Sequence, residues 1–205
     1  MLDSVMAQRP ALRSLQSYLA RVIYLSGIRA NQATIIAGIV GVIAGVLFAK
    51  KNLALGMIAL GLSGILDAVD GTIAREHESA TKLGGVLDLT LDRIVEAVVL
   101  LGLIWPHSGL QLPAAVVLAT WYVNITVFMA TGAALGANEK LIHYPPGLVE
   151  RTEAFIFFVL LALAPIWGAY LCYAYAGFEA ATVAQRITYA LRYLRKLKEV
   201  NSNGQ

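Results

Sequence analysis

The sequence DAVDGTIAR at residues 67–75, followed by GGVLDLTLD at residues 84–92, places four aspartates within or beside apolar segments of this 205-residue chain. A carboxylate near the centre of a bilayer costs about 2.5–3.5 kcal/mol on insertion scales, so four of them require compensation. In each stretch the two aspartates are three or four residues apart, which puts them on one face of a helix. The two pairs are Asp67 with Asp70, and Asp88 with Asp92.

The segment between the two pairs determines how they meet. Residues 76–82 are few and charged, so we expect them in the cytoplasm, joining two antiparallel helices whose carboxylates converge at the cytoplasmic end. An oxygen-only cluster without His or Cys suits hard cations, and four carboxylates suffice for two Mg²⁺ or Mn²⁺ ions. Two such ions about 3.5–4 Å apart clamp the attacking and leaving oxygens of a phosphoryl displacement. The pattern therefore predicts a phosphate-handling site.

The residues beside the aspartates leave room for a ligand. Gly71 and Ala74 present little bulk, and Gly84 opens the next helix in the same way. Arg75 offers a planar guanidinium to phosphate oxygens.

Beyond this hairpin, the composition is that of an integral membrane protein. Hydrophobic residues make up 58% of the chain and charged residues 14%, whereas a soluble domain has about 45–50% and about 25%. The net charge is only +3, which argues against a nucleic-acid partner. The single cysteine, Cys172, cannot form an internal disulfide.

The apolar segments can be divided into spans of about 20 residues each. The first is residues 30–49, the second continues from residues 52–66 into the first aspartate pair, and the third begins near Gly84. Residues 97–138 are uncharged over 42 positions, too many for one pass, and the turn-forming residues 106–109 divide them.

The last apolar stretch, residues 154–178, could be one span or a hairpin that turns near Pro165. A single span would leave the basic residues from 186 to 198 on the outer side, against the positive-inside rule. With a turn near Pro165, both termini are cytoplasmic and 14 of the 16 basic residues lie on that side. We therefore predict an all-α polytopic membrane protein with six transmembrane helices.

The N-terminal residues predict one further helix. Apolar residues recur at helical spacing after Pro10, which favours an interfacial amphipathic helix on the membrane surface. The alternative is an amphipathic helix packed on other helices. The predicted divisions are an interfacial segment (1–29), a transmembrane catalytic domain (30–196) and a cytoplasmic tail (197–205).

The aspartate stretches resemble the signature of the CDP-alcohol phosphotransferase family. Every motif position is filled across 26 residues: Asp67-Ala-Val-Asp70-Gly71-Thr-Ile-Ala74-Arg75, then Gly84, Asp88 and Asp92. The resemblance implies a homodimeric membrane enzyme. In this enzyme a CDP-linked alcohol, usually CDP-diacylglycerol, donates its phosphatidyl group to a second alcohol and releases CMP.

The resemblance also implies roles for individual residues. Asp67, Asp70 and Asp88 would bind two divalent cations. Asp92 would act as general base and is a further candidate metal ligand; a base is required because an alcohol is a poor nucleophile. The implied CDP-binding residues are Gly71, Ala74, Arg75 and Gly84, joined by Asn31 and Thr34, which resemble a family Asn-x-x-Thr element but could equally cap a helix.

Three basic residues are candidates for binding the acceptor: Lys140, Arg151 and Arg186. Residues 150–153 and 185–186 are similar to segments of bacterial phosphatidylglycerophosphate and phosphatidylinositol-phosphate synthases, in which basic residues at comparable places hold the acceptor's phosphate. This favours a phosphorylated acceptor, glycerol 3-phosphate or inositol phosphate. The alternative is membrane anchoring, with Arg151 paired to Glu150 or Glu153. The roles of Arg93 and Glu96 stay open.

Other functions fit the same residues less well. A member of the same family could use serine, free inositol or a diacylglycerol acceptor. A cation transporter could use the aspartate cluster, but it would carry ions without releasing nucleotide.

Overall fold

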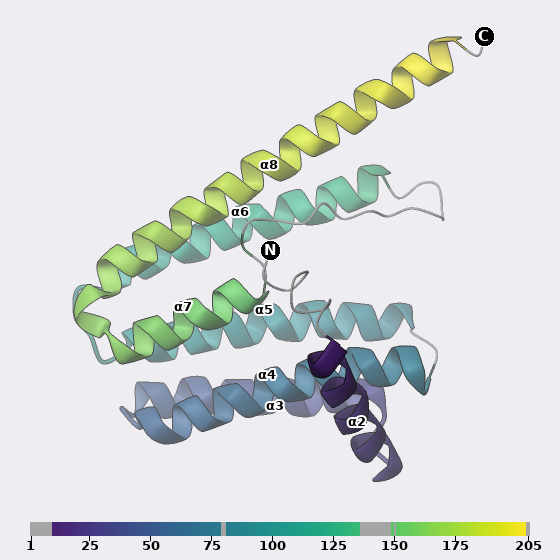
Figure 1. Cartoon of the computed structure of the whole chain (residues 1–205). Coiled ribbons are helices and arrows are strands. Elements are labelled where there is room, and N and C mark those ends of the chain that lie inside the picture. The colour runs from purple at the N-terminus through teal and green to yellow at the C-terminus, as the bar shows by residue number, and fades with distance from the viewer. Residues whose placement is uncertain (1–9, 79–80, 136–148, 150, 204–205) are drawn as a thin grey trace.

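The computed structural model describes residues 10–78, 81–135, 149 and 151–203, and each regular element within them is a helix. The predicted all-α class is confirmed for this part of the chain. In chain order the elements are α2 (Pro10–Leu25), α3 (Ala30–Ala49), α4 (Leu53–Glu76), α5 (Lys82–Ile104), α6 (Gln111–Leu135), α7 (Arg151–Leu163), the short 3₁₀ helix η1 (Pro165–Trp167) and α8 (Gly168–Asn203) (Figure 1).

Helices α3 to α8 run back and forth between the two ends of the molecule (Figure 1). Whereas the shorter α7 starts near the middle of the picture, the right-hand end in Figure 1 carries the connection between α4 and α5 and the C-terminus of α8. α2 crosses α3 and α4 at this same end. The loop that joins the two aspartate-bearing helices and the helix α2 therefore lie at the same end of the bundle.

The helix boundaries agree with the pattern of apolar residues. The first predicted span coincides with α3. Residues 106–109, expected to form a turn, lie between α5 and α6. The predicted break near Pro165 is also present, because α7 ends at Leu163 and the following helices are bent from it by 111°.

Three described helices are long and apolar enough to cross a membrane: α3, α4 and residues Gln111–Ala133 of α6. α7 together with the helices after Pro165 forms a fourth, bent candidate. Large apolar side chains such as Ile39, Ile58 and Leu62 are exposed on the outside, as expected for a protein whose surroundings are acyl chains. The protein is a multi-pass membrane protein, and the number of six spans remains a prediction.

Close packing of α3 on α5 fixes the helices that carry the aspartates. A Cβ atom added at Gly102 would collide with the backbone of Gly45, and one added at Gly45 would lie 2.5 Å from the carbonyl oxygen of Val98. α4 is tied to α3 by Ser63 Oγ, which donates to the carbonyl of Ala37 over 2.8 Å. Small residues allow this backbone approach in membrane helices. α3 thus holds α4 and α5 on its two sides.

α2 lies against the N-terminal part of α3 and the C-terminal part of α4. Ala20 is fully buried with Val69 and Ile73 of α4, while Tyr18 on another face of α2 is 64% exposed. α2 therefore has both a packed face and an open apolar face, and its position on a membrane surface remains a prediction.

Candidate active site

The aspartate pairs on α4 and α5 face one another. Ligand oxygens of Asp67, Asp70 and Asp88 all lie within 4.8 Å of one another. Asp70 is only 5% exposed, and its Oδ2 atom has no hydrogen-bond partner among the described residues. A buried carboxylate oxygen without a partner is costly in a protein interior, so the geometry fits a cation in this position.

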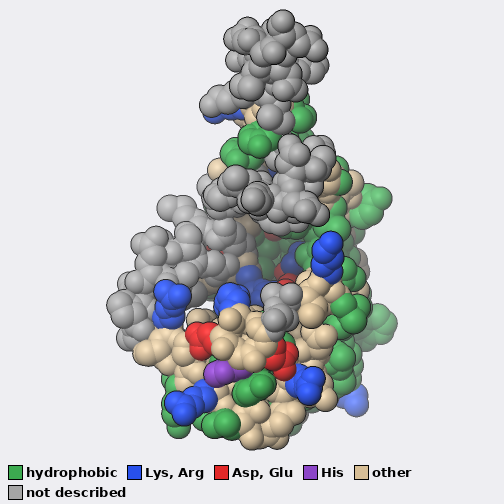
Figure 2. All heavy atoms as spheres, turned by 90° about the vertical axis from the view of Figure 1, so that its right-hand side faces the viewer, with side chains coloured by type: hydrophobic (Ala, Val, Ile, Leu, Met, Phe, Trp, Pro, Cys, Tyr) green, Lys and Arg blue, Asp and Glu red, His purple; other side chains and the backbone are tan. Residues whose placement is uncertain are grey.

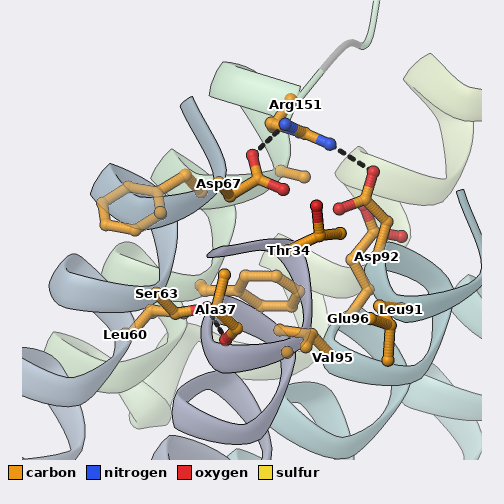
Figure 3. Close-up of a pocket in the computed structure, with 15 residues that line it drawn as sticks. Thr34, Ala37, Leu60, Ser63, Asp67, Leu91, Asp92, Val95, Glu96 and Arg151 are labelled. Carbon is orange, nitrogen blue, oxygen red and sulfur yellow. Dashed lines mark hydrogen bonds and ion pairs between the residues drawn. The ribbon is translucent and has the colours of Figure 1, made fainter. Parts of the chain in front are cut away.

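Arg151, from the first turn of α7, reaches into this cluster. Its guanidinium bonds Asp67 on one side and Asp92 on the other (Figure 3), and its Nη2 lies 3.7 Å from Asp88 Oδ1. The planar guanidinium carries five donors, so it can join carboxylates from two helices at once. The sequence did not predict this contact, because Arg151 is 84 positions from Asp67 and 59 positions from Asp92 along the chain.

A cavity of about 230 Å³ opens beside Asp70 and Asp88 between α3, α4 and α5. Its lining contains all six residues predicted to bind CDP: Asn31, Thr34, Gly71, Ala74, Arg75 and Gly84. The structure therefore brings the six together beside the aspartates. We call this space the donor cavity.

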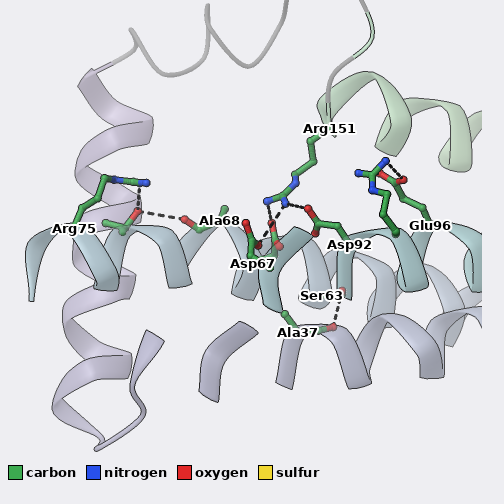
Figure 4. Close-up of polar contacts among 11 residues, drawn as sticks. Ala37, Ser63, Asp67, Ala68, Arg75, Asp92, Glu96 and Arg151 are labelled. Carbon is green, nitrogen blue, oxygen red and sulfur yellow. Dashed lines mark hydrogen bonds and ion pairs between the residues drawn. The ribbon is translucent and has the colours of Figure 1, made fainter. Parts of the chain in front are cut away.

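Local features of α4 and α5 shape the donor cavity. Thr81 caps α5 by accepting a hydrogen bond from the Gly84 N–H over 3.0 Å, and the N-terminus of a helix favours anions such as phosphate. A Cβ atom added at Gly84 would lie 2.8 Å from Asn31 Oδ1. Arg75 donates from Nη2 to Thr72 Oγ1 over 3.2 Å (Figure 4).

The end of α4 is held by α2. Ser17 Oγ donates to Glu76 Oε1 over 2.8 Å, and the ring of Tyr24 stacks on His77 at 4.9 Å between centroids. These contacts place α2 against the rim of the donor cavity. Figure 2 views this end of the molecule, where acidic and basic side chains gather around a hollow.

A second cavity, of about 210 Å³, lies on the other side of the cluster between α5, α6, α7 and α8. Two of the three predicted acceptor residues, Arg151 and Arg186, line it; Lys140 lies outside the described residues. Asn124 and Glu179 also line it, and sequence reasoning did not select them. Glu179 could have been recognised from the sequence, because it is the charged residue that directly follows the uncharged stretch 154–178. We call this space the acceptor cavity.

Arg93 and Glu96 form a pair in the wall of the acceptor cavity (Figure 4). Arg93 Nη1 lies 2.6 Å from Glu96 Oε2, and Nη2 donates to Oε1 over 2.8 Å. Glu96 also lines a small cavity of about 70 Å³ beneath the contact of Arg151 with Asp67 (Figure 3). The two charges thus neutralise one another beside the cluster.

The comparisons with known proteins agree on one family. Residues 28–190 match the family model described as CDP-alcohol phosphatidyltransferase. Phosphatidylinositol phosphate synthase of Mycobacteroides abscessus is 29% identical over 168 residues, which are 82% of this chain and 76% of that protein.

Solved structures show the same fold. The crystal structure of Mycobacterium tuberculosis phosphatidylinositol phosphate synthase with CDP-DAG bound superposes with a TM-score of 0.72 at 23% identity, covering 86% of this chain and 94% of that one. The structure of the same enzyme with manganese and citrate also has a TM-score of 0.72, at 24% identity, covering 86% and 88%.

Proposed function

This chain belongs to the CDP-alcohol phosphatidyltransferase family, and on that premise we propose that it transfers the phosphatidyl group of CDP-diacylglycerol to a phosphorylated alcohol. Inositol phosphate is the first candidate acceptor, because a relative of similar sequence is a phosphatidylinositol phosphate synthase. Glycerol 3-phosphate is the second.

One observation carries this proposal: the carboxylate cluster lies between two cavities with different linings. The donor cavity has small residues and Arg75 beside the aspartates, whereas the acceptor cavity contains Arg151 and Arg186 in addition to the paired Arg93 and Glu96. Guanidinium groups bind phosphate through paired hydrogen bonds, so the acceptor cavity suits an alcohol that carries a phosphate. The two substrates would then meet at the cluster.

We assign two divalent cations, Mg²⁺ or Mn²⁺, to Asp67, Asp70, Asp88 and Asp92. The fit rests on the oxygen-only ligand set and on the unpartnered Oδ2 of Asp70. When bound, the cations stabilise negative charge on the pyrophosphate of the donor.

The chain's own residues supply the remaining steps. Arg75 and the other five predicted CDP-binding residues, which line the donor cavity, hold the CDP group. Arg151, Arg186 and Lys140 hold the acceptor phosphate. Asp92 takes the proton from the acceptor hydroxyl as its oxygen attacks the lipid-linked phosphorus; the new phosphorus–oxygen bond replaces the one to CMP, which leaves. The acyl chains of the donor stay in the lipid throughout.

The same proposal includes the topology. Six spans place both termini and the active site in the cytoplasm, with residues 1–29 on the membrane surface, residues 30–196 as the catalytic domain and residues 197–205 as a tail. A homodimer, as implied by family analogy, completes it. The support is the distribution of basic residues and the back-and-forth course of α3 to α8 (Figure 1).

Metal-dependent CMP release from CDP-diacylglycerol, measured over a panel of alcohols and phospho-alcohols, tests the function. Asp92→Asn should abolish turnover while CDP-diacylglycerol binding survives, because the variant keeps its shape but lacks the base. Turnover like that of the wild type would exclude Asp92 as the base. Ion flux in proteoliposomes without CMP release would instead favour a transporter.

A further inference from the structure

Three polar side chains form a continuous chain between α6 and α8. Asn124 on α6 donates from Nδ2 to Glu179 on α8. Arg186, two turns further along α8, donates from Nη1 to Asn124 Oδ1 over 2.6 Å. Glu179 is 3% exposed and Asn124 is 9% exposed. All three residues line the acceptor cavity.

The chemistry of the three groups fixes the orientation of the amide. An ionised carboxylate only accepts hydrogen bonds and a guanidinium only donates them. The NH₂ group of Asn124 must therefore face Glu179, and its oxygen must face Arg186. Were the carboxylate absent, the amide could turn its NH₂ group toward the guanidinium, which has no acceptor to offer it.

The Arg186 guanidinium is held from a second direction as well. Its central carbon lies 4.9 Å from the centroid of the Phe128 ring, a distance at which the ring face attracts a cation. An ionisable residue buried in a membrane helix is costly and is by default a candidate for function. Glu179 is such a residue, because it is buried and directly follows the uncharged stretch 154–178.

We propose that Glu179 is a positioning residue, which acts through the Asn124 amide to hold the Arg186 guanidinium in the orientation that binds the acceptor phosphate. This inference rests on the proposed function, in which Arg186 contacts that phosphate. Glu179 itself then acts without touching the reacting atoms.

The test uses the full-length protein in lipid nanodiscs, with inositol phosphate as the varied substrate and CDP-diacylglycerol and Mg²⁺ held constant. Glu179→Leu and Asn124→Leu should each raise the KM for inositol phosphate about tenfold. The KM for CDP-diacylglycerol should stay within about twofold, because the donor cavity contains neither residue. Glu179→Gln keeps a carbonyl oxygen for Asn124, so it should rescue most of the loss.

Thr188→Ala is the matched control, because Thr188 is exposed on the same helix and its hydroxyl donates to the carbonyl of Ala184 within that helix. Its kinetic constants should equal those of the wild type. Adding Glu179→Leu to Arg186→Ala should raise the KM for inositol phosphate no further, since both changes remove the same contact.

An unchanged KM for inositol phosphate in both leucine variants would overturn the inference, as would independent, multiplying effects in the double variant. If the leucine variants do not fold, Glu179→Ala and Asn124→Ala replace them, and the cycle of Glu179→Ala with Arg186→Ala decides by the same criterion. A wild-type protein that releases CMP with no phosphorylated alcohol would instead overturn the proposed function.

Discussion

The donor and acceptor cavities differ in how the chain builds them. The six residues of the donor cavity that we assign to CDP come from the start of α3 and from one helical hairpin, residues 67–92. The acceptor cavity takes its charged residues from α5, α7 and α8, between Arg93 and Arg186. The lining of the donor cavity includes several small residues and one arginine, whereas that of the acceptor cavity includes three arginines. The chemistry shared by a family can thus be encoded locally, while the choice of acceptor depends on contacts between distant segments.

Arg151 lies where the two regions meet. It lines the acceptor cavity, yet its guanidinium bonds the carboxylates of Asp67 and Asp92. Two of the carboxylates that we propose to hold the cations therefore also bind this guanidinium. Arg151 thus belongs both to the acceptor cavity and to the carboxylate cluster.

The largest expected effect comes from breaking the cluster that both cavities share. Asp70→Asn should lower turnover about 1,000-fold and weaken Mn²⁺ binding, because it removes one anionic ligand from a buried position. Turnover is measured as CMP release, and Mn²⁺ binding by electron paramagnetic resonance of the purified protein.

Glu76→Gln is the control for Asp70→Asn, because it removes the same charge from the same helix at a residue that bonds Ser17 of α2. It should leave Mn²⁺ affinity unchanged. Wild-type Mn²⁺ affinity in Asp70→Asn would remove Asp70 from the ligand set, and the two cavities would no longer share a metal centre through it.

A smaller effect separates the acceptor cavity from the donor cavity. Charge reversal by Arg186→Glu should raise the KM for a phosphorylated acceptor about 10- to 100-fold, because a charge-assisted contact with phosphate becomes a repulsive one. The KM for CDP-diacylglycerol should change less than about twofold. Both constants come from initial rates of CMP release.

Arg192→Glu makes the same charge change at an exposed position of α8 and should alter neither constant. An acceptor KM that is equal in Arg186→Glu and the wild type would place the acceptor phosphate elsewhere. Equal rises in both substrate constants would show that the two cavities are not independent.

The sequence predicted the donor side better than the acceptor side, for physical reasons. The spacing of Asp67, Asp70 and Asp88 determines their faces on two helices that a short loop joins, and α3 packs against both of these helices. The length of an uncharged apolar stretch was enough to locate α3, and the distribution of basic residues was enough to place the break near Pro165. The contact of Arg151 with the cluster depends instead on how α7 packs against α4 and α5, which no local pattern specifies.

The pairing of Asn124 with Glu179 could not be predicted from a local pattern either, because the two residues are 55 positions apart. A polar residue in an apolar stretch can be recognised from sequence, but its partner cannot. Lys140 lies outside the described residues, so its place in the acceptor cavity stays a prediction.

The smallest effect tests whether the donor cavity depends on individual glycines. A Cβ atom at Gly84 would meet Asn31 Oδ1 at 2.8 Å and Thr81 Oγ1 at 3.1 Å, whereas one at Gly85 would meet nothing within 4 Å. Both glycines line the donor cavity near the start of α5, and replacement by alanine raises helix propensity equally at both. The difference between the two variants therefore isolates the contact with Asn31 and the helix cap.

Gly84→Ala should raise the KM for CDP-diacylglycerol about fivefold, because Asn31 and Thr81 must shift to admit the methyl group. Gly85→Ala should leave that KM unchanged, and neither variant should alter the KM for the acceptor. Measuring both constants for both variants checks this. If Gly84→Ala raised only the acceptor KM, the assignment of the two cavities to the two substrates would have to be exchanged; if both variants behaved alike, helix propensity rather than space at Gly84 would control the donor cavity.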